Sequence, residues 1–118
     1  MTNREKLTMD YQSSIRTNEQ EMDEIKKKKK TLDEKRERLH EFKRREMAFY
    51  NQLLSEYPKD TLKDTKRSIE DLYYETQHLC RKQEQGYEQE AEEIERHRKK
   101  LSAQKESLEW DYRLAMQR

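Results

Sequence analysis

A single proline, Pro58, lies almost midway along a chain of 118 residues that otherwise has the composition of a helix from end to end. Proline lacks an amide hydrogen and its ring clashes with the preceding turn, so a long helix is interrupted at that position. The chain holds one glycine, Gly86, and is rich in Glu, Lys, Arg, Gln and Leu, which favour helix. The sequence therefore predicts two helices of nearly equal length that fold back on each other near Pro58.

Composition decides what kind of helical protein this is. Charged residues make up 45% of the chain and hydrophobic residues 30%, which excludes a large globular core. Low hydrophobicity is also a sign of disorder, but the sustained apolar spacing favours a coiled coil. The predicted fold class is all-α, a long antiparallel two-helix hairpin. It forms one domain over residues 1–118, with the first helix over about 3–56, the turn over about 57–60 and the second helix over about 61–117.

The start of each helix carries its own signal. The run Thr2-Asn3-Arg4-Glu5 has the form of a capping box, in which a threonine and a glutamate three residues later bond each other's backbone amides. We therefore expect the first helix to begin near Asn3. After the turn, Asp60 or Thr61 is expected to cap the second helix.

Apolar residues at alternating intervals of four and three mark the expected interface between the helices. In the first helix this row comprises Tyr11, Ile15, Asn18, Met22, Ile25, Lys29, Leu32, Arg36 and Leu39. Its three polar members are expected to restrict the register of the two helices. At Phe42 the row slips by one position and continues to Phe49 and Leu53.

The second helix is expected to present two successive rows. The first comprises Leu62, Ile69, Leu72 and Leu79, and the second comprises Tyr87, Ile94, Leu101, Leu108 and Ala115. Gly86 lies where one row gives way to the other. A local kink, a close contact with another helix or a tolerated drift of the pattern would each account for a glycine there.

The order of the charges supports an antiparallel arrangement. A hairpin centred on the proline puts residue i opposite roughly residue 117 minus i. The basic run Lys26–Lys30 then lies beside the acidic stretch 84–95, and Glu19 faces Arg98. Because the net charge is only +1, this lysine run is the one candidate for nucleic-acid binding, and we favour its neutralisation by the second helix. We expect no nucleic-acid partner.

The sequence gives no sign of a membrane or extracellular protein. Its first residues lack the apolar core of a signal peptide, and no stretch approaches the about 20 apolar residues that cross a bilayer. The single cysteine, Cys80, forms no intramolecular disulfide and fits a reducing compartment. We therefore expect a cytoplasmic protein without membrane insertion.

No residue pattern predicts catalysis, a cofactor or a metal ion. His40, His78 and His97 are scattered, and His78 and Cys80 point about 200° apart on a helix, so they cannot share one metal ion. One glycine is too few for a phosphate-binding loop. We expect a protein that is not an enzyme.

Large apolar residues gather near the turn and near the end of the second helix. Those near the turn occupy more than one helix face, so a single interhelical interface cannot bury them all. Exposed residues of this kind are typical anchors of protein interfaces, although a thicker hydrophobic cap on the hairpin is the alternative. The candidate partner-binding residues are Phe42, Phe49, Tyr50, Leu53, Leu54, Tyr57, Trp110 and Tyr112.

Two of these stretches carry a family resemblance. The segment Phe49–Tyr57, placed before a short turn between two charged helices, and the run Trp110-Asp111-Tyr112 resemble small helical-hairpin proteins encoded beside LXG-type toxins in Gram-positive bacteria. Those proteins belong to the WXG-like superfamily and target toxins for export by the type VII secretion system. The turn here lacks the Trp-any-Gly of WXG-type hairpins, and no Tyr or Phe near the C-terminus is followed four residues later by Asp. The resemblance therefore implies that a second small hairpin supplies the export signal.

The function implied by this resemblance is a non-catalytic adaptor or chaperone. It would bind the N-terminal helical domain of an LXG-type toxin and help to target that domain to the type VII secretion system. Its partners would be the toxin domain and a second small helical hairpin, and export together with the client stays open. The coiled-coil pattern alone also allows a self-associating structural scaffold, and a homo-oligomer is compatible with both functions.

Overall fold

The computed structural model describes residues 2–56 and 63–117, which form two long helices. Helix α1 spans Asn3–Glu56 and helix α2 spans Lys63–Gln117. No strand occurs in these two ranges, and the predicted all-α two-helix hairpin is confirmed. The predicted turn at 57–60, the cap at Asp60 or Thr61, and Leu62 all lie outside the described residues.

The predicted capping box closes the N-terminus of α1. The Thr2 amide donates a hydrogen bond to Glu5 Oε2 at 3.3 Å, and the Glu5 amide donates one to Thr2 Oγ1 at 3.1 Å. The Lys6 amide donates to the Thr2 carbonyl at 3.1 Å and begins the helical ladder. Because the first amides of a helix have no partner inside it, these reciprocal bonds fix where α1 starts.

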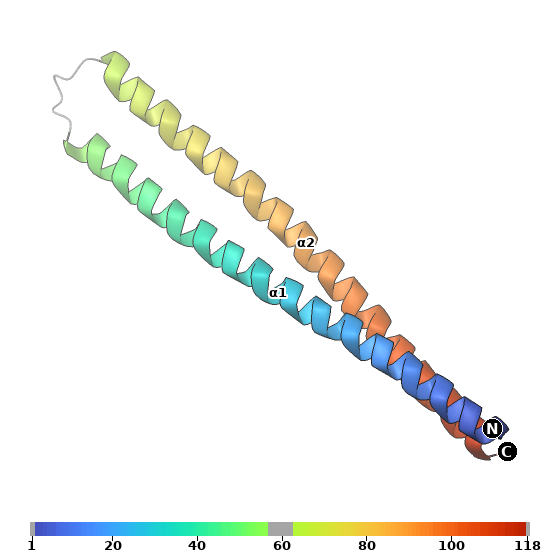
Figure 1. The fold of residues 1–118 in the computed structure, drawn as a ribbon. Helices are drawn as coiled ribbons and strands as arrows, with labels where there is room; N and C mark the ends of the chain where they lie inside the picture. Colours follow the sequence, from blue (N-terminus) through green and yellow to red (C-terminus); the bar gives the residue numbers. More distant parts are fainter. Residues whose placement is uncertain (1, 57–62, 118) are drawn as a thin grey trace. The chain divides into compact units, whose positions relative to one another are not determined.

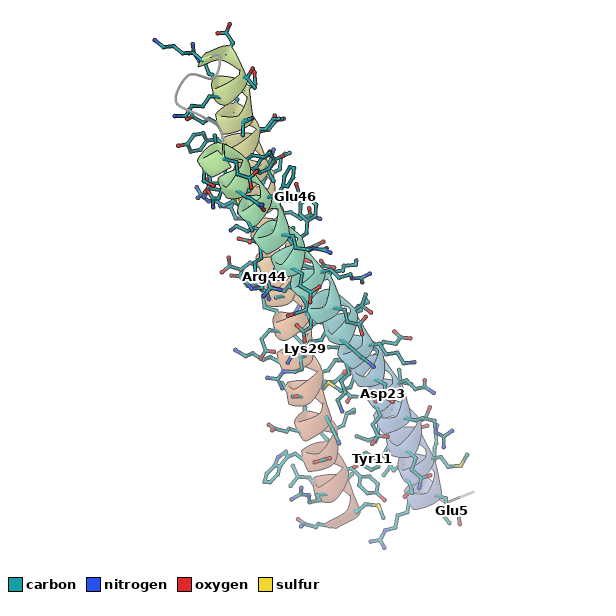
Figure 2. All side chains as sticks on the ribbon, turned by 90° about the vertical axis from the view of Figure 1, so that its left-hand side faces the viewer. Glu5, Tyr11, Asp23, Lys29, Arg44 and Glu46 are labelled. Carbon is teal, nitrogen blue, oxygen red and sulfur yellow. The ribbon has the colours of Figure 1, made fainter. Side chains whose placement is uncertain are left out.

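The chain divides into two compact units, each built from one segment of α1 and one segment of α2. Unit 1 consists of Met1–Thr31 and Ala91–Arg118, and unit 2 consists of Leu32–Glu90. In unit 1 the N-terminal part of α1 lies beside the C-terminal part of α2, so the two segments run antiparallel (Figure 1). Charged side chains project from the outer faces of both helices (Figure 2).

Unit 1 has a narrow interface with a polar residue in its apolar row. Ile25 and Leu101 are buried, and Asn18 is only 3% exposed. Asn18 Nδ2 donates hydrogen bonds to the carbonyl oxygen of Leu101 at 2.9 Å and to Gln104 Oε1 at 3.1 Å. A buried amide has to keep such partners, so these bonds restrict the register of the two segments.

An aromatic pair extends the interface of unit 1 toward the N-terminus of α1 and the C-terminus of α2. The rings of Tyr11 and Tyr112 stack with centroids 4.1 Å apart and planes inclined by 7°. The hydroxyl groups of Tyr112 and Thr8 share a hydrogen bond of 3.0 Å. Figure 2 shows Tyr11 between the two segments of this unit. Tyr112 thus contributes to packing within the chain.

The interface of unit 2 buries Leu32 of α1 together with Ile69 and Cys80 of α2. One ion pair crosses between its segments, with Lys43 Nζ 3.3 Å from Glu84 Oε1. Both side chains remain partly exposed, so the pair contributes little to stability. The apolar contacts therefore define this interface.

Two leucines predicted to lie in the interface of unit 2 lie outside it. Leu72 is 49% exposed and Leu79 is 57% exposed, whereas their neighbours Tyr73 and Cys80 face α1. The seven-residue repeat that includes Tyr87 continues unbroken through Cys80 and Tyr73, so α2 shows no change of row at its glycine. The prediction for the two leucines was wrong because it followed the most hydrophobic residues instead of the continuous repeat.

Gly86 lies within α2, and its backbone keeps the helical conformation. Its φ angle is not positive, and the helix continues on both sides of it. A Cβ atom added at this position would meet nothing within 4 Å. The space beside Gly86 is therefore open, and nothing in unit 2 itself requires a glycine there.

The predicted register is also wrong. It placed Asn18 opposite Lys99 and Tyr50 opposite Arg67, whereas the structure pairs Asn18 with Leu101 and places the Tyr50 ring 6.4 Å from that of Tyr73. The prediction assumed that the hairpin is centred on the proline, and the matching blocks of charge supported it. In the structure the apolar rows and the hydrogen bonds of Asn18 set the register, and exposed charge pairs are too weak individually to hold it to that centre.

The observed charge pairs also differ from the predicted ones. Arg98, expected to face Glu19, instead pairs with Glu95 one turn away on α2, at 2.6 Å between Nη2 and Oε1. Lys29 and Arg36, predicted in the interface, are exposed. In the described parts of the chain, charge therefore surrounds the interface without forming it.

Candidate interaction surface

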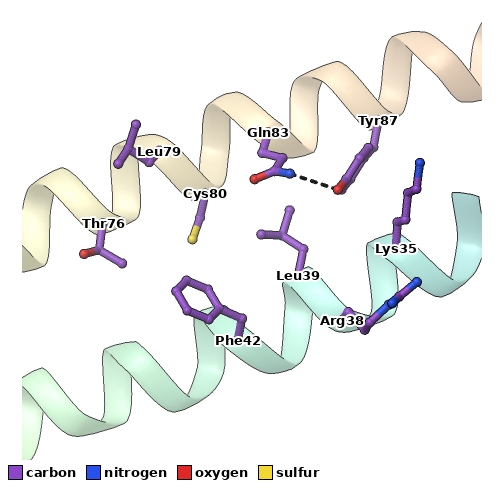
Figure 3. Close-up of a pocket in the computed structure, with 9 residues that line it drawn as sticks. All are labelled: Lys35, Arg38, Leu39, Phe42, Thr76, Leu79, Cys80, Gln83 and Tyr87. Atoms are coloured by element: carbon purple, nitrogen blue, oxygen red, sulfur yellow. Dashed lines mark hydrogen bonds between the residues drawn. The ribbon is translucent and has the colours of Figure 1, made fainter.

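A groove of about 660 Å³ opens between the two segments of unit 2 (Figure 3). Leu39 and Phe42 of α1 point toward α2 across it, and Cys80 of α2 points toward Phe42. The side chains that line it are Lys35, Arg38, Leu39, Phe42, Thr76, Leu79, Cys80, Gln83 and Tyr87. Most of this lining is apolar, so the groove is suited to contact with apolar groups.

The floor of the groove contains the thiol of Cys80, which is free and buried. Loss of hydration on burial disfavours the thiolate and raises the pKa of Cys80, and the negative charges of Glu84 and Glu46 act in the same direction. The nearby Lys43 ammonium opposes this shift. A protonated thiol is a poor nucleophile, so Cys80 acts here as a small apolar packing group.

Four large apolar side chains extend this surface along both helices. Phe42 is 44% exposed and Phe49, seven residues later on α1, is 55% exposed. On α2, Leu72 and Leu79 are likewise exposed and seven residues apart. Because residues seven apart lie on the same face of a helix, the four side chains form two parallel exposed rows. We call Phe42, Phe49, Leu72 and Leu79 the groove surface.

The two rims of the groove differ in charge. The α1 rim carries Lys35 and Arg38, whereas the α2 rim carries the uncharged Gln83 and Tyr87. Gln83 Nε2 donates a hydrogen bond to the Tyr87 hydroxyl at 2.9 Å, drawn as a dashed line in Figure 3. The groove is therefore basic along one side and neutral along the other.

An aromatic cluster adjoins the groove surface in unit 2. Phe49, Tyr50, Tyr73 and Tyr74 form a chain of edge-to-face contacts with centroid distances of 5.8, 6.4 and 5.4 Å. Thr76 Oγ1 lies 3.5 Å from the Tyr50 hydroxyl, at the outer limit of a hydrogen bond. Phe49 is thus exposed but supported from one side by a half-buried tyrosine.

The structure separates the predicted partner-binding residues into three groups. Phe42, Phe49 and Trp110 are exposed, and Trp110 is 59% exposed in unit 1. Half-buried positions are occupied by Tyr50, Leu53, Leu54 and Tyr112. Tyr57 lies outside the described residues. Of the predicted set, Phe42 and Phe49 belong to the groove surface.

Sequence reasoning missed four residues of this surface and its rim, namely Leu72, Leu79, Lys35 and Arg38. The signal for the leucines was present in the sequence, because they precede Tyr73 and Cys80 directly and form a second row beside the continuous repeat. A helix with two adjacent apolar rows can bury only one of them in a two-helix interface.

The described residues show no arrangement that could hold a metal ion, since no three His, Cys, Asp or Glu side chains converge in them. Neither α1 nor α2 has, within its described part, an apolar stretch long enough to cross a membrane. Comparisons with protein-family models, with curated proteins and with solved structures found no match.

Proposed function

We propose that this chain is a non-catalytic helical adaptor that binds a helical domain of another protein through the groove surface. The observation that carries the proposal is the pair of exposed apolar rows in unit 2. Following the resemblance of Phe49–Tyr57 and Trp110-Asp111-Tyr112, the client is the N-terminal helical domain of an LXG-type toxin. A second small hairpin would supply the export signal to the type VII secretion system.

The energetics of exposed apolar groups support a binding role. Full burial of a large apolar side chain contributes about 1.5 to 3 kcal/mol, and the groove surface leaves four such side chains about half exposed. A helical client that covers them gains most of the remaining contribution. The thiol at the floor of the groove adds apolar contact, since its raised pKa keeps it protonated.

Copurification tests the proposal directly. The tagged full chain is co-expressed with the N-terminal helical domain of an LXG-type toxin from the source genome, and the complex is measured by size-exclusion chromatography with light scattering. We expect a stable complex with the unchanged chain and its loss with Phe42→Ser and Leu79→Ser combined. Absence of any complex with the unchanged chain would refute the toxin-adaptor function.

A matched control separates the groove surface from exposed apolar residues in general. Leu7→Ser combined with Met9→Ser removes two exposed apolar side chains of unit 1 and should leave the complex intact. Circular dichroism of each variant checks that helicity is retained. A self-associating scaffold, the alternative function, would instead give a stable homo-oligomer of the chain alone in the same chromatography.

A further inference from the structure

We propose that the occupant of the groove surface is a single amphipathic helix with apolar residues at heptad spacing and acidic residues along the flank that faces α1. This inference deepens the adaptor function and rests on it, because it specifies the chemistry of the client segment. It follows from three features of unit 2: the spacing of the apolar rows, the charge of one rim and the open space at Gly86.

The spacing of the rows fits a helix better than a compact ligand. Phe42 and Leu79 both line the groove, and Phe49 and Leu72 lie one heptad farther along each helix. One heptad advances a helix by about 10.5 Å, so a third helix with its own heptad repeat meets both pairs in turn. A compact ligand would fill the groove and leave the second pair exposed.

The positive charge of the α1 rim indicates that the flank of the bound helix facing α1 is acidic. Lys35 and Arg38 line the groove, and Arg45, seven residues after Arg38, lies on the same face of α1. None of these three cations forms an ion pair with another described residue. Acidic side chains on the facing flank of an incoming helix would complement them, and basic ones would be repelled.

The open space at Gly86 extends the surface on the α2 side. Gly86 follows Leu79 by seven residues, so it continues the exposed row of Leu72 and Leu79. Nothing lies within 4 Å of the place where its Cβ would be. A helix lying along the row can therefore approach the backbone of α2 closely at this point, as small residues permit at helix interfaces.

Two synthetic peptides test the inference without the toxin. Both are about three heptads long with leucine at the a and d positions, and they carry either glutamate or lysine along both flanks. Fluorescence anisotropy measures their binding to the full chain. We expect the acidic peptide to bind at least about tenfold more tightly than the basic peptide, and the difference to shrink as salt is raised.

Three variants of the chain test whether the groove causes the preference for the acidic peptide. Lys35→Glu combined with Arg38→Glu should invert the order of the two peptides, because it reverses the charge of the rim. The matched control, Lys27→Glu combined with Lys28→Glu, changes two exposed lysines of unit 1 and should keep the order. Phe42→Ser combined with Leu79→Ser should remove binding of both peptides at least about tenfold.

The inference would be overturned by equal affinity for the two peptides, by an order unchanged in the rim variant, or by a chain that dimerises through Phe42 and Leu79 and so covers its own groove. These results are distinct from failure of the adaptor function. If the toxin domain does not copurify but the acidic preference is found, the inference stands and the toxin assignment fails. If the toxin domain binds equally well to the rim variant, the inference fails while the adaptor function stands.

Discussion

Unit 1 and unit 2 use the same interhelical packing and differ in what they leave uncovered. In unit 1 the interface is closed by Asn18, by buried aliphatic residues and by the Tyr11–Tyr112 stack. In unit 2 the segment of α2 has two adjacent apolar rows, and the row of Leu72 and Leu79 faces away from the interface. The difference shows that α2 carries, in unit 2, a second apolar row that one partner helix cannot bury.

The largest expected effect contrasts a buried leucine of unit 1 with an exposed leucine of unit 2. Leu101→Ala should lower the free energy of unfolding by about 2 to 5 kcal/mol, because it opens a cavity in the interface. Leu79→Ala should change it by less than about 0.5 kcal/mol. Urea unfolding followed by circular dichroism measures both. Equal losses would mean that Leu79 is covered in solution, and the contrast between the units would fail.

A second prediction concerns the polar residue in unit 1. Asn18→Leu should raise the free energy of unfolding by about 1 to 2 kcal/mol, because it removes a buried amide that needs hydrogen bonds. It should also loosen the register that those bonds restrict. Lysine cross-linking with mass spectrometry would then detect additional, shifted pairs.

The control for this change is Gln12→Leu, which places the same side chain at an exposed position of the same segment. That variant should keep one set of cross-links. An unchanged cross-linking pattern in Asn18→Leu would show that apolar packing alone sets the register of unit 1.

A smaller gain is expected at the glycine of unit 2. Gly86→Ala should raise the free energy of unfolding by about 1 kcal/mol, because alanine favours helix more than glycine and its Cβ meets nothing within 4 Å. Gln85→Ala, at the exposed neighbouring position, should stay within about 0.5 kcal/mol. A loss of stability in Gly86→Ala would contradict the open space described there.

The smallest effect belongs to the exposed ion pair of unit 1. Hydrogen bonds from Arg98 hold the pKa of the Glu95 carboxyl below its ordinary value. Since the folded-state pKa is the lower one, the pair stabilises the fold above the ordinary carboxyl pKa, and this contribution is lost as the pH falls through the lowered pKa. An NMR titration of Glu95 should show its pKa rise in Arg98→Gln. Arg96→Gln should leave the pKa of Glu95 unchanged. A similar rise of this pKa in Arg96→Gln would show that nearby positive charge in general, and not Arg98, causes the shift.

Much of the fold could be predicted from local chemistry. The capping box at Thr2 is recognisable from four residues, and the row from Tyr11 to Leu32 follows a regular spacing in which Lys29 alone is exposed. The register could not be predicted in this way, because it depends on how Asn18 and the apolar rows pack against α2. The position of the proline, on which the predicted register is centred, does not decide such packing, and exposed charge pairs are too weak to do so.

The candidate surface could be predicted only in part. Phe42 and Phe49 stood out as large apolar residues on more than one face of the first helix. The sequence pattern places Leu72 and Leu79 in the interface, because leucine is a stronger hydrophobe than the tyrosine and cysteine beside them. Of the two adjacent rows, the one that continues the repeat through Tyr73 and Cys80 is buried. This becomes clear only when the two segments of unit 2 are packed together.

The position of Cys80 gives this chain an internal reporter. It is the sole sulfhydryl in the sequence and is buried at the floor of the groove, so a small alkylating reagent reaches it only when the two segments of unit 2 separate. The alkylation rate at this sulfur would therefore record, without any added label, how often those segments separate.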